Sequence, residues 1–161
     1  MNNELSDLTV VILTHKTNKN IIENCLSSID PKVKIILIEN SNNFLLKDHI
    51  ENKYKNVSIF CSGSNLGYAG GNNYGLKLTK TPYALVLNPD TICNKDFFKN
   101  IKEYLSNKID FTIIGCQYKK NSIWQPAGYF NKKKNLENTY EKNNQELLKV
   151  DWVVGCAMLL N

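Results

Sequence analysis

The stretch LTVVILT at residues 8–14 is a continuous run of apolar and β-branched residues. Such a run is typical of a strand that is buried on both faces of a sheet. After it, Asn18 can cap a helix of regularly spaced apolar residues, which Pro31 ends. A second strand-like run, VKIILI at residues 33–38, follows. This order of strand, helix and strand predicts a crossover unit with parallel strands.

The same alternation continues to about residue 116. Further strands are predicted at 57–61, 83–87 and 111–115, and further helices at 44–54, up to Leu78, and from Asn94. Strands separated by helices favour an α/β fold with a mostly parallel central sheet and helices on both faces. Because ligands of such sheets bind beyond the carboxyl ends of the strands, we expect the functional residues there.

The remainder of the chain divides into two segments of different character. Residues 117–149 are polar, with seven lysines and three glutamates, and predict a hairpin with a mobile loop. The apolar stretch VDWVVGCAMLL at 150–160 predicts a strand that returns to the sheet. We therefore expect one domain with a core at 1–116, an excursion at 117–149 and a returning strand at 150–161. Because the chain stops directly after this strand, we expect a fragment of a longer protein.

Composition excludes several classes of protein. The 161 residues are 42% hydrophobic and 22% charged, as in a globular domain. No apolar run reaches the roughly 18 residues that span a bilayer, and the N-terminus does not resemble a signal peptide. The five cysteines are widely spaced and the histidines number two, so neither a zinc site nor a disulfide framework is predicted. These features favour a cytoplasmic protein.

The formal net charge of +5 rests on lysine alone, because the chain has no arginine. Nucleic-acid binders usually combine a basic stripe with arginine forks and stacking aromatic residues, so nucleic acid is not a predicted partner. A solvated lysine surface is the simpler interpretation, and peripheral membrane contact through anionic lipid headgroups is left open.

The strongest candidate site is LVLNPDT at residues 85–91, where a buried strand ends in a short polar turn. Pro89 restricts the backbone so that Asn88 and Asp90 point the same way. A carboxylate at a strand end suits a hard divalent cation that is shared with substrate phosphates. The alternative is an ordinary turn in which Asp90 or Thr91 caps the next helix.

A glycine-rich turn, SGSNLGYAGGNNYG at residues 62–75, follows another strand and opens a helix. Glycines let a backbone approach a ligand closely, and the unpaired N–H groups of a helix N-terminus suit a diphosphate. The stretch matches neither the dinucleotide fingerprint nor a P-loop. The alternative is that its glycines serve only the packing of a helix against a strand.

Two further strand ends carry polar residues, THK at 14–16 and ENS at 39–41. A hydroxyl and a carboxylate on adjacent strand ends can bind the donor and acceptor edge of a pyrimidine. His15 by itself is more often a surface or capping histidine than a catalyst.

In this order, the segments VVILTHK, IILIENSN, NLGYAGGNN, YALVLNPDT and VDWVVGCAMLL resemble the family 2 glycosyltransferases, especially the bacterial group that includes rhamnosyltransferases. The resemblance implies the GT-A fold with its Rossmann-like nucleotide-binding half. It also implies inverting transfer of a sugar from a UDP-, dTDP- or GDP-linked donor with Mg2+ or Mn2+. The implied acceptor is a glycan or lipid-linked saccharide in cell-surface polysaccharide synthesis, at the inner face of the cell membrane.

The resemblance assigns roles to residues at three strand ends. Thr14 matches a residue that meets the nucleotide base. Glu39 stands where the family usually has a base-reading aspartate. Asn88 and Asp90 match the DxD motif, with Asn88 at the ribose-facing position and Asp90 at the metal position.

The glycine-rich turn supplies three further candidate donor-binding residues, Asn65, Gly67 and Asn73. Asn73 and Gly75 match the family's ARNxG-like pattern. Asn72 replaces the arginine of that pattern, which puts a diphosphate contact at this position in doubt.

The family's catalytic base lies in an acidic motif after the last strand, so we expect it beyond Asn161 and expect this fragment alone to be inactive. Two other functions stay open. One is a non-catalytic nucleotide-sugar-binding module in which Asp90 only caps a helix. The other is a sugar nucleotidyltransferase, which is disfavoured because THKTNKN at 14–20 lacks the glycines that hold a triphosphate.

Overall fold

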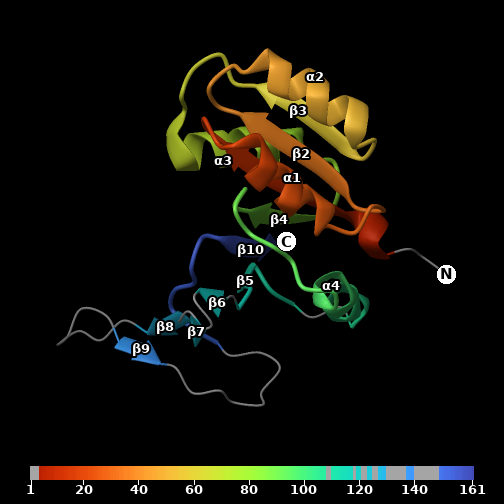
Figure 1. The fold of residues 1–161 in the computed structure, drawn as a ribbon. Coiled ribbons are helices and arrows are strands. Elements are labelled where there is room, and N and C mark those ends of the chain that lie inside the picture. The colour runs from red at the N-terminus through yellow and green to blue at the C-terminus, as the bar shows by residue number, and fades with distance from the viewer. Residues whose placement is uncertain are drawn as a thin grey trace.

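The computed structural model describes residues 4–107, 110–117, 119–120, 123–124, 127–129, 137–139 and 149–161. Its main sheet has six strands in the order β3-β2-β1-β4-β10-β5 (Figure 1). These strands are β1 (Leu8–Thr14), β2 (Lys34–Glu39), β3 (Val57–Cys61), β4 (Tyr83–Leu87), β5 (Ile113–Gly115) and β10 (Ala157–Leu160). The helices are the 3-10 turn η1 (Glu4–Asp7), α1 (Lys19–Ser27), α2 (Phe44–Lys53), α3 (Gly67–Leu78) and α4 (Phe97–Ser106).

The sheet is mostly parallel. Strand β1 pairs in parallel with β2 and β4, and β2 pairs in parallel with β3. Strand β10 lies between β4 and β5 and runs antiparallel to both. The predicted α/β class is confirmed, and the returning strand does join the sheet, over residues 157–160 rather than 150–160.

Helices cover both faces of the sheet because neighbouring residues of a buried strand point to opposite sides. Val10 and Ile12 of β1 belong to one core cluster with apolar residues of α1, α2 and α4. On the opposite face, α3 packs so closely that a Cβ atom at Gly75 would overlap the Val11 side chain. The near-continuous apolar character of LTVVILT follows from this two-sided burial.

Helix α1 begins where the sequence predicts it, since Asn18 Oδ1 accepts a hydrogen bond from the Asn20 N–H. Helix α4 begins later than predicted, at Phe97 rather than after Asn94. The reason is local: Asn94 Oδ1 accepts from the Asp96 N–H and forms a turn ahead of the helix.

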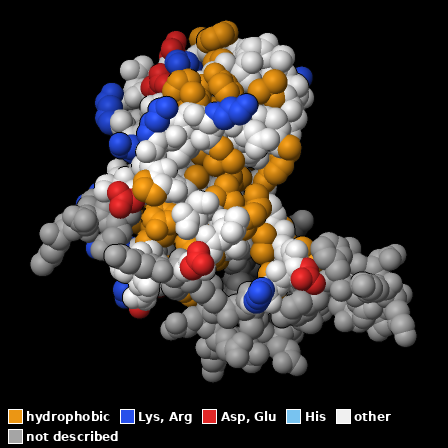
Figure 2. Space-filling model, turned by 180° about the vertical axis from the view of Figure 1, so that it is seen from behind, with side chains coloured by type: hydrophobic (Ala, Val, Ile, Leu, Met, Phe, Trp, Pro, Cys, Tyr) orange, Lys and Arg blue, Asp and Glu red, His pale blue; other side chains and the backbone are white. Residues whose placement is uncertain are grey.

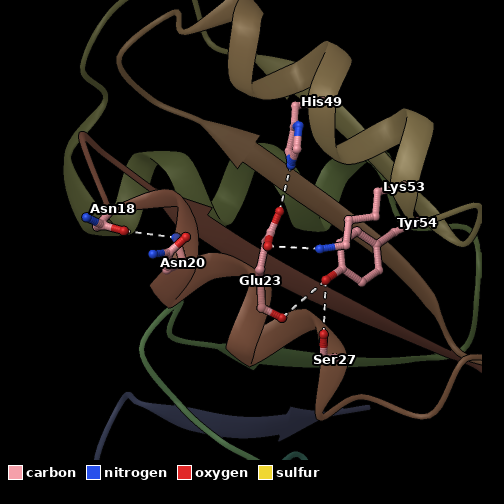
Figure 3. A network of polar contacts seen from close by, with 7 residues as sticks. All are labelled: Asn18, Asn20, Glu23, Ser27, His49, Lys53 and Tyr54. Atoms are coloured by element: carbon pink, nitrogen blue, oxygen red, sulfur yellow. Dashed lines mark hydrogen bonds and ion pairs between the residues drawn. The ribbon is translucent and has the colours of Figure 1, made fainter.

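Helices α1 and α2 lie side by side and share a polar network (Figure 3). Glu23 on α1 accepts from His49 Nε2 at 2.6 Å and from Lys53 Nζ at 2.9 Å. The Tyr54 hydroxyl lies 3.0 Å from Ser27 Oγ. The bonds from Lys53 and His49 lower the pKa of the Glu23 carboxyl.

Four short strands lie within residues 117–149: β6 (Lys119–Lys120), β7 (Ile123–Trp124), β8 (Ala127–Tyr129) and β9 (Glu137–Thr139). Strand β6 pairs antiparallel with β7, and β8 pairs antiparallel with β9. The rest of the predicted hairpin and loop lies outside the described residues, and the division of the chain at 116 and 149 stays a prediction.

The surface is mixed in character. On the face shown in Figure 2, lysine and acidic side chains are interspersed around a band of hydrophobic side chains. Among the described helices, none combines the length and apolarity that a membrane crossing requires.

Candidate functional site

The carboxyl ends of the parallel strands bring most of the sequence-predicted residues to one edge of the sheet. Thr14 and Glu39 are neighbours there, because they are the last paired residues of β1 and β2. Asn88 follows Leu87, which pairs with Ile12 near the same end of β1. The pairing of the strands therefore places the carboxyl ends of β1, β2 and β4 side by side (Figure 1).

Thr14 carries a buried hydroxyl at this edge. The residue is 1% exposed, and Oγ1 has no hydrogen-bond partner among the residues that the structure describes. Buried polar atoms are almost always paired in folded proteins, so an orphaned hydroxyl marks a place where a ligand atom would restore a bond. Recognition of a nucleotide base by Thr14 stays a prediction.

Glu39 is fully buried, and its carboxylate points into its own turn. It accepts hydrogen bonds from the Ser41 N–H, the Ser41 hydroxyl and the Asn43 N–H. These bonds order the turn between β2 and α2, in which Asn42 adopts the left-handed conformation with φ 57°. Glu39 thus has a structural role that the sequence analysis missed, and its contact with a base stays a prediction.

The glycine-rich turn between β3 and α3 divides its glycines between two tasks. Gly63 and Gly67 have φ of 80° and 68°, which a β-carbon would oppose. Gly71 and Gly75 lie on the sheet side of α3, where a Cβ atom would overlap Leu13 or Val11. The packing alternative is therefore correct for these two glycines.

The asparagines of this segment take different positions. Asn65 is exposed, and its Oδ1 accepts from the Gly67 N–H at 3.0 Å at the start of α3. Asn72, which stands where the family pattern has an arginine, is buried, and its side-chain amide donates to the Tyr68 carbonyl. It therefore supplies no positive charge at this position. Asn73 is exposed, on the side of α3 that is turned away from Gly71.

Asp90 lies in the turn after β4, and its side chain is exposed. The turn is closed by a bond from the Thr91 N–H to the Asn88 carbonyl at 3.2 Å. Asp90 does not cap α4, because the N-cap of that helix is Asp96. Within the described ranges, the Asp90 carboxylate makes no hydrogen bond or ion pair, so it is available to a ligand.

The donors at this edge fit a shared cation rather than a protein cage. No group of three or more histidine, cysteine or acidic residues that could hold a metal occurs in the part of the chain that the structure describes. Mg2+ in proteins often takes only one or two carboxylates and completes its shell with phosphate oxygens and water. One exposed carboxylate at Asp90 is compatible with that mode.

Thiols surround the same turn without offering a nucleophile. Cys25 Sγ lies 3.6 Å from the Asn88 carbonyl, and the Cys156 carbonyl accepts from the Asn88 N–H at 2.9 Å. Burial raises the pKa of Cys25 to about 12, and the Asp90 charge adds to the rise. Because a thiolate is the reactive form, Cys25 acts as a packing residue.

The segment before β10 closes against α3. The Tyr68 hydroxyl donates to the Gly155 carbonyl, 87 residues away in the chain. A Cβ atom at Gly155 would lie 3.1 Å from the same hydroxyl, so a larger residue there would require the tyrosine to shift slightly. Together with the bond from Asn88 to Cys156, this contact joins the turn after β4 to the start of α3. Sequence reasoning carried no signal for it, because the partners are far apart in the chain.

Comparison with known proteins identifies the family of this chain. The family model described as glycosyl transferase family 2 matches residues 9–161, which is nearly the whole chain. The chain belongs to glycosyl transferase family 2. The predicted family is thereby confirmed, while the rhamnosyltransferase-like subgroup stays a prediction.

A characterised relative agrees with this family assignment. The chain is 30% identical over 101 residues to the low-salt glycan biosynthesis hexosyltransferase Agl10 of Haloferax volcanii, which covers 60% of this chain and 32% of that protein. This family 2 chain therefore spans about a third of the length of the relative.

Two solved structures show the same fold. TarS of S. aureus, residues 1–349 in complex with UDP-GlcNAc, has a TM-score of 0.62 at 20% identity, covering 78% of this chain and 38% of the TarS 1–349 chain. The mannosyltransferase PcManGT from Pyrobaculum calidifontis, in complex with GDP-Man and Mn2+, has a TM-score of 0.57 at 14% identity, covering 68% of this chain and 35% of PcManGT. The GT-A fold predicted from the sequence is confirmed.

Proposed function

We propose that this chain is the nucleotide-sugar-binding half of an inverting glycosyltransferase. The enzyme would transfer a sugar from a nucleotide-diphosphate donor to a glycan or lipid-linked acceptor in cell-surface polysaccharide synthesis. The observation that carries the proposal is that the ends of β1 and β4, at one edge of the sheet, hold the buried Thr14 hydroxyl and the exposed Asp90 carboxylate, neither of which has a hydrogen-bond partner among the described residues. The glycan biosynthesis role of Agl10 and the nucleotide-sugar complexes of TarS and PcManGT support it.

The donor would lie across the strand ends. Its base would meet Thr14 at the end of β1, beside Glu39, and its ribose would face Asn88 at the end of β4. Its diphosphate would extend toward the N-terminus of α3, where Asn65 Oδ1 accepts from the Gly67 N–H and the N-cap Leu66 supplies no side-chain oxygen to the N–H groups that follow. Helix N-termini of this kind attract anions.

Three residues of the turn and helix complete the proposed donor site. Asn65 and Gly67 border the start of α3, and Asn73 stays a candidate on the exposed side of the helix. Mg2+ or Mn2+ would be held by Asp90 together with diphosphate oxygens, and when bound it would neutralise the leaving diphosphate.

The wider assignments rest on family resemblance. They are transfer of a hexosyl or rhamnosyl group and a location in the cytoplasm at the inner face of the membrane. We also retain the proposal that the fragment alone binds the donor without turning it over.

Calorimetric titration tests the proposed function. UDP, dTDP and GDP would each be titrated into the protein with Mn2+ and again with excess chelator. We expect one of the three to bind, and to bind more tightly with the metal. Absence of metal-dependent binding for all three would refute the proposal.

A further inference from the structure

Asn40 is a buried polar residue at the end of β2 on which the loops of the proposed donor site converge. It is 2% exposed. Its backbone N–H donates to the Thr14 carbonyl at 2.8 Å, and its own carbonyl lies 3.0 Å from His15 Nδ1. The main chain of Asn40 therefore joins the end of β2 to the end of β1.

The side chain of Asn40 reaches the turn between β3 and α3. Its Oδ1 accepts from Ser62 Oγ and from the Leu66 N–H, both at 2.9 Å. Its Nδ2 donates to Asn65 Oδ1 at 2.8 Å. The same Asn65 oxygen accepts from the Gly67 N–H, the first residue of α3. One amide thus connects two strand ends to the start of a helix.

The polarity of these bonds permits only an amide at this position. The Leu66 N–H can only donate, so it requires the oxygen of Asn40. Asn65 Oδ1 is already fixed as an acceptor by Gly67, so it requires the Nδ2 group of Asn40. An aspartate has the same shape but would place a second acceptor against Asn65. If Asn65 then turned its amide, the Gly67 N–H would lose its partner.

We propose that Asn40 is the positioning residue of the donor site. It holds the N-terminus of α3, where the diphosphate would bind, in fixed geometry to the ends of β1 and β2, where the base would bind. The inference rests on the proposed function, and Asn40 acts through α3 because it is buried beneath the edge. Buried hydrogen bonds that lock a loop are the usual way in which a site is preorganised.

The test compares Asn40→Asp with a matched control, Asn56→Ala. Asn56 Nδ2 donates to the Val33 carbonyl at 2.9 Å, close to the start of β2, so its loss also removes a side-chain bond between neighbouring segments. Each variant is titrated with a nucleoside diphosphate and with the matching nucleoside monophosphate, both with Mn2+. Amide hydrogen exchange at Leu66 and Gly67 is measured in the absence of nucleotide.

We expect Asn40→Asp to weaken diphosphate binding by at least about tenfold and to weaken monophosphate binding much less, because the second phosphate meets the start of α3. Exchange at Gly67 should accelerate. Asn56→Ala should leave both affinities within about twofold of wild type. A purely structural role would lower the two affinities together and would not single out the diphosphate.

Asn65→Ala removes the acceptor of the Asn40 Nδ2 bond, at the exposed residue of the pair. It replaces Asn40→Asp in the test if that variant does not fold. It should show the same selective loss of diphosphate affinity. Wild-type diphosphate affinity in folded Asn40→Asp or Asn65→Ala, or an equal loss in Asn56→Ala, would overturn the positioning role while leaving the proposed function intact. Failure of the wild-type protein to bind any nucleotide would overturn both.

Discussion

Replacing Asp90 by asparagine removes one exposed negative charge at the end of β4 and keeps the shape of the side chain. If Asp90 holds a divalent cation together with the donor diphosphate, this change should weaken metal-dependent nucleotide binding. It should leave folding unaffected, because the carboxylate makes no hydrogen bond or ion pair to the described residues. The two effects separate a ligand-binding role from a structural one.

The size of the effect follows from the exposure of the site. A carboxylate about 2.1 Å from a divalent ion is attracted by about 4 kcal/mol in the dielectric of bulk water. Bulk water is the appropriate limit, since Asp90 is exposed. Partial dehydration of the ion opposes this attraction, and diphosphate oxygens keep part of the affinity. We therefore expect a net loss of at least ~1.4 kcal/mol, a factor of ten in affinity.

The assay is calorimetric titration of the nucleoside diphosphate that wild type prefers, with Mn2+ and with chelator. Asp96→Asn is the matched control, because it also replaces an aspartate by asparagine. Asp96 lies six positions after Asp90 and is the N-cap of α4, where its side chain makes no capping hydrogen bond. We expect the control to bind the nucleotide with the affinity of wild type. The free energies of unfolding of both variants should lie within about 0.5 kcal/mol of the wild-type value. Equal affinity of Asp90→Asn and wild type in Mn2+ would refute the assignment of Asp90.

Three further predictions concern folding and thiol chemistry. Gly75→Ala should lower the free energy of unfolding by about 1–3 kcal/mol in chemical denaturation, because its Cβ would overlap a β1 side chain; unchanged stability would contradict the close packing of α3. The pKa of Glu23 is lowered from 4.5 by Lys53 and His49, so its contribution to stability is complete above that value and is lost as the pH falls through the lowered pKa. Melting curves across this range should show less pH dependence in Glu23→Gln than in wild type. Iodoacetamide at pH 8 should modify the half-buried Cys61 before Cys25, whose pKa of about 12 keeps it protonated. Mass spectrometry of partly labelled protein measures the order, and earlier labelling of Cys25 would contradict the prediction.

Local signals accounted for most of the elements. The run LTVVILT predicted β1 with the bounds that the structure shows, and the cap at Asn18 predicted the start of α1, because burial on both faces and capping act over a few residues. The helix ends at Ser27, earlier than Pro31, which the sequence predicted as its end. The start of α4 was predicted too early. The turn before that helix is held by contacts within the turn and with the end of α1, where the Cys93 N–H donates to Ser28 Oγ.

The sequence predicted where the candidate site residues lie in the fold, but not which hydrogen bonds they make. Parallel strands guarantee that Thr14, Glu39 and Asn88 follow strand ends at one edge, so their proximity followed from the strand assignments. The inward-turned carboxylate of Glu39 did not follow, because its donors lie in a turn whose left-handed residue no pattern marked.

By itself, the sequence determined the α/β class, the family and the edge of the sheet that carries the candidate site, since hydrophobic runs and turn residues act over short distances. Only the tertiary structure decided which polar atoms are paired there. Asn40 meets Asn65 and Leu66 across more than twenty residues, and these bonds exist only once β2 and β3 lie side by side. Likewise, only the folded chain reveals that the Thr14 hydroxyl at the end of β1 is buried without a hydrogen-bond partner among the described residues.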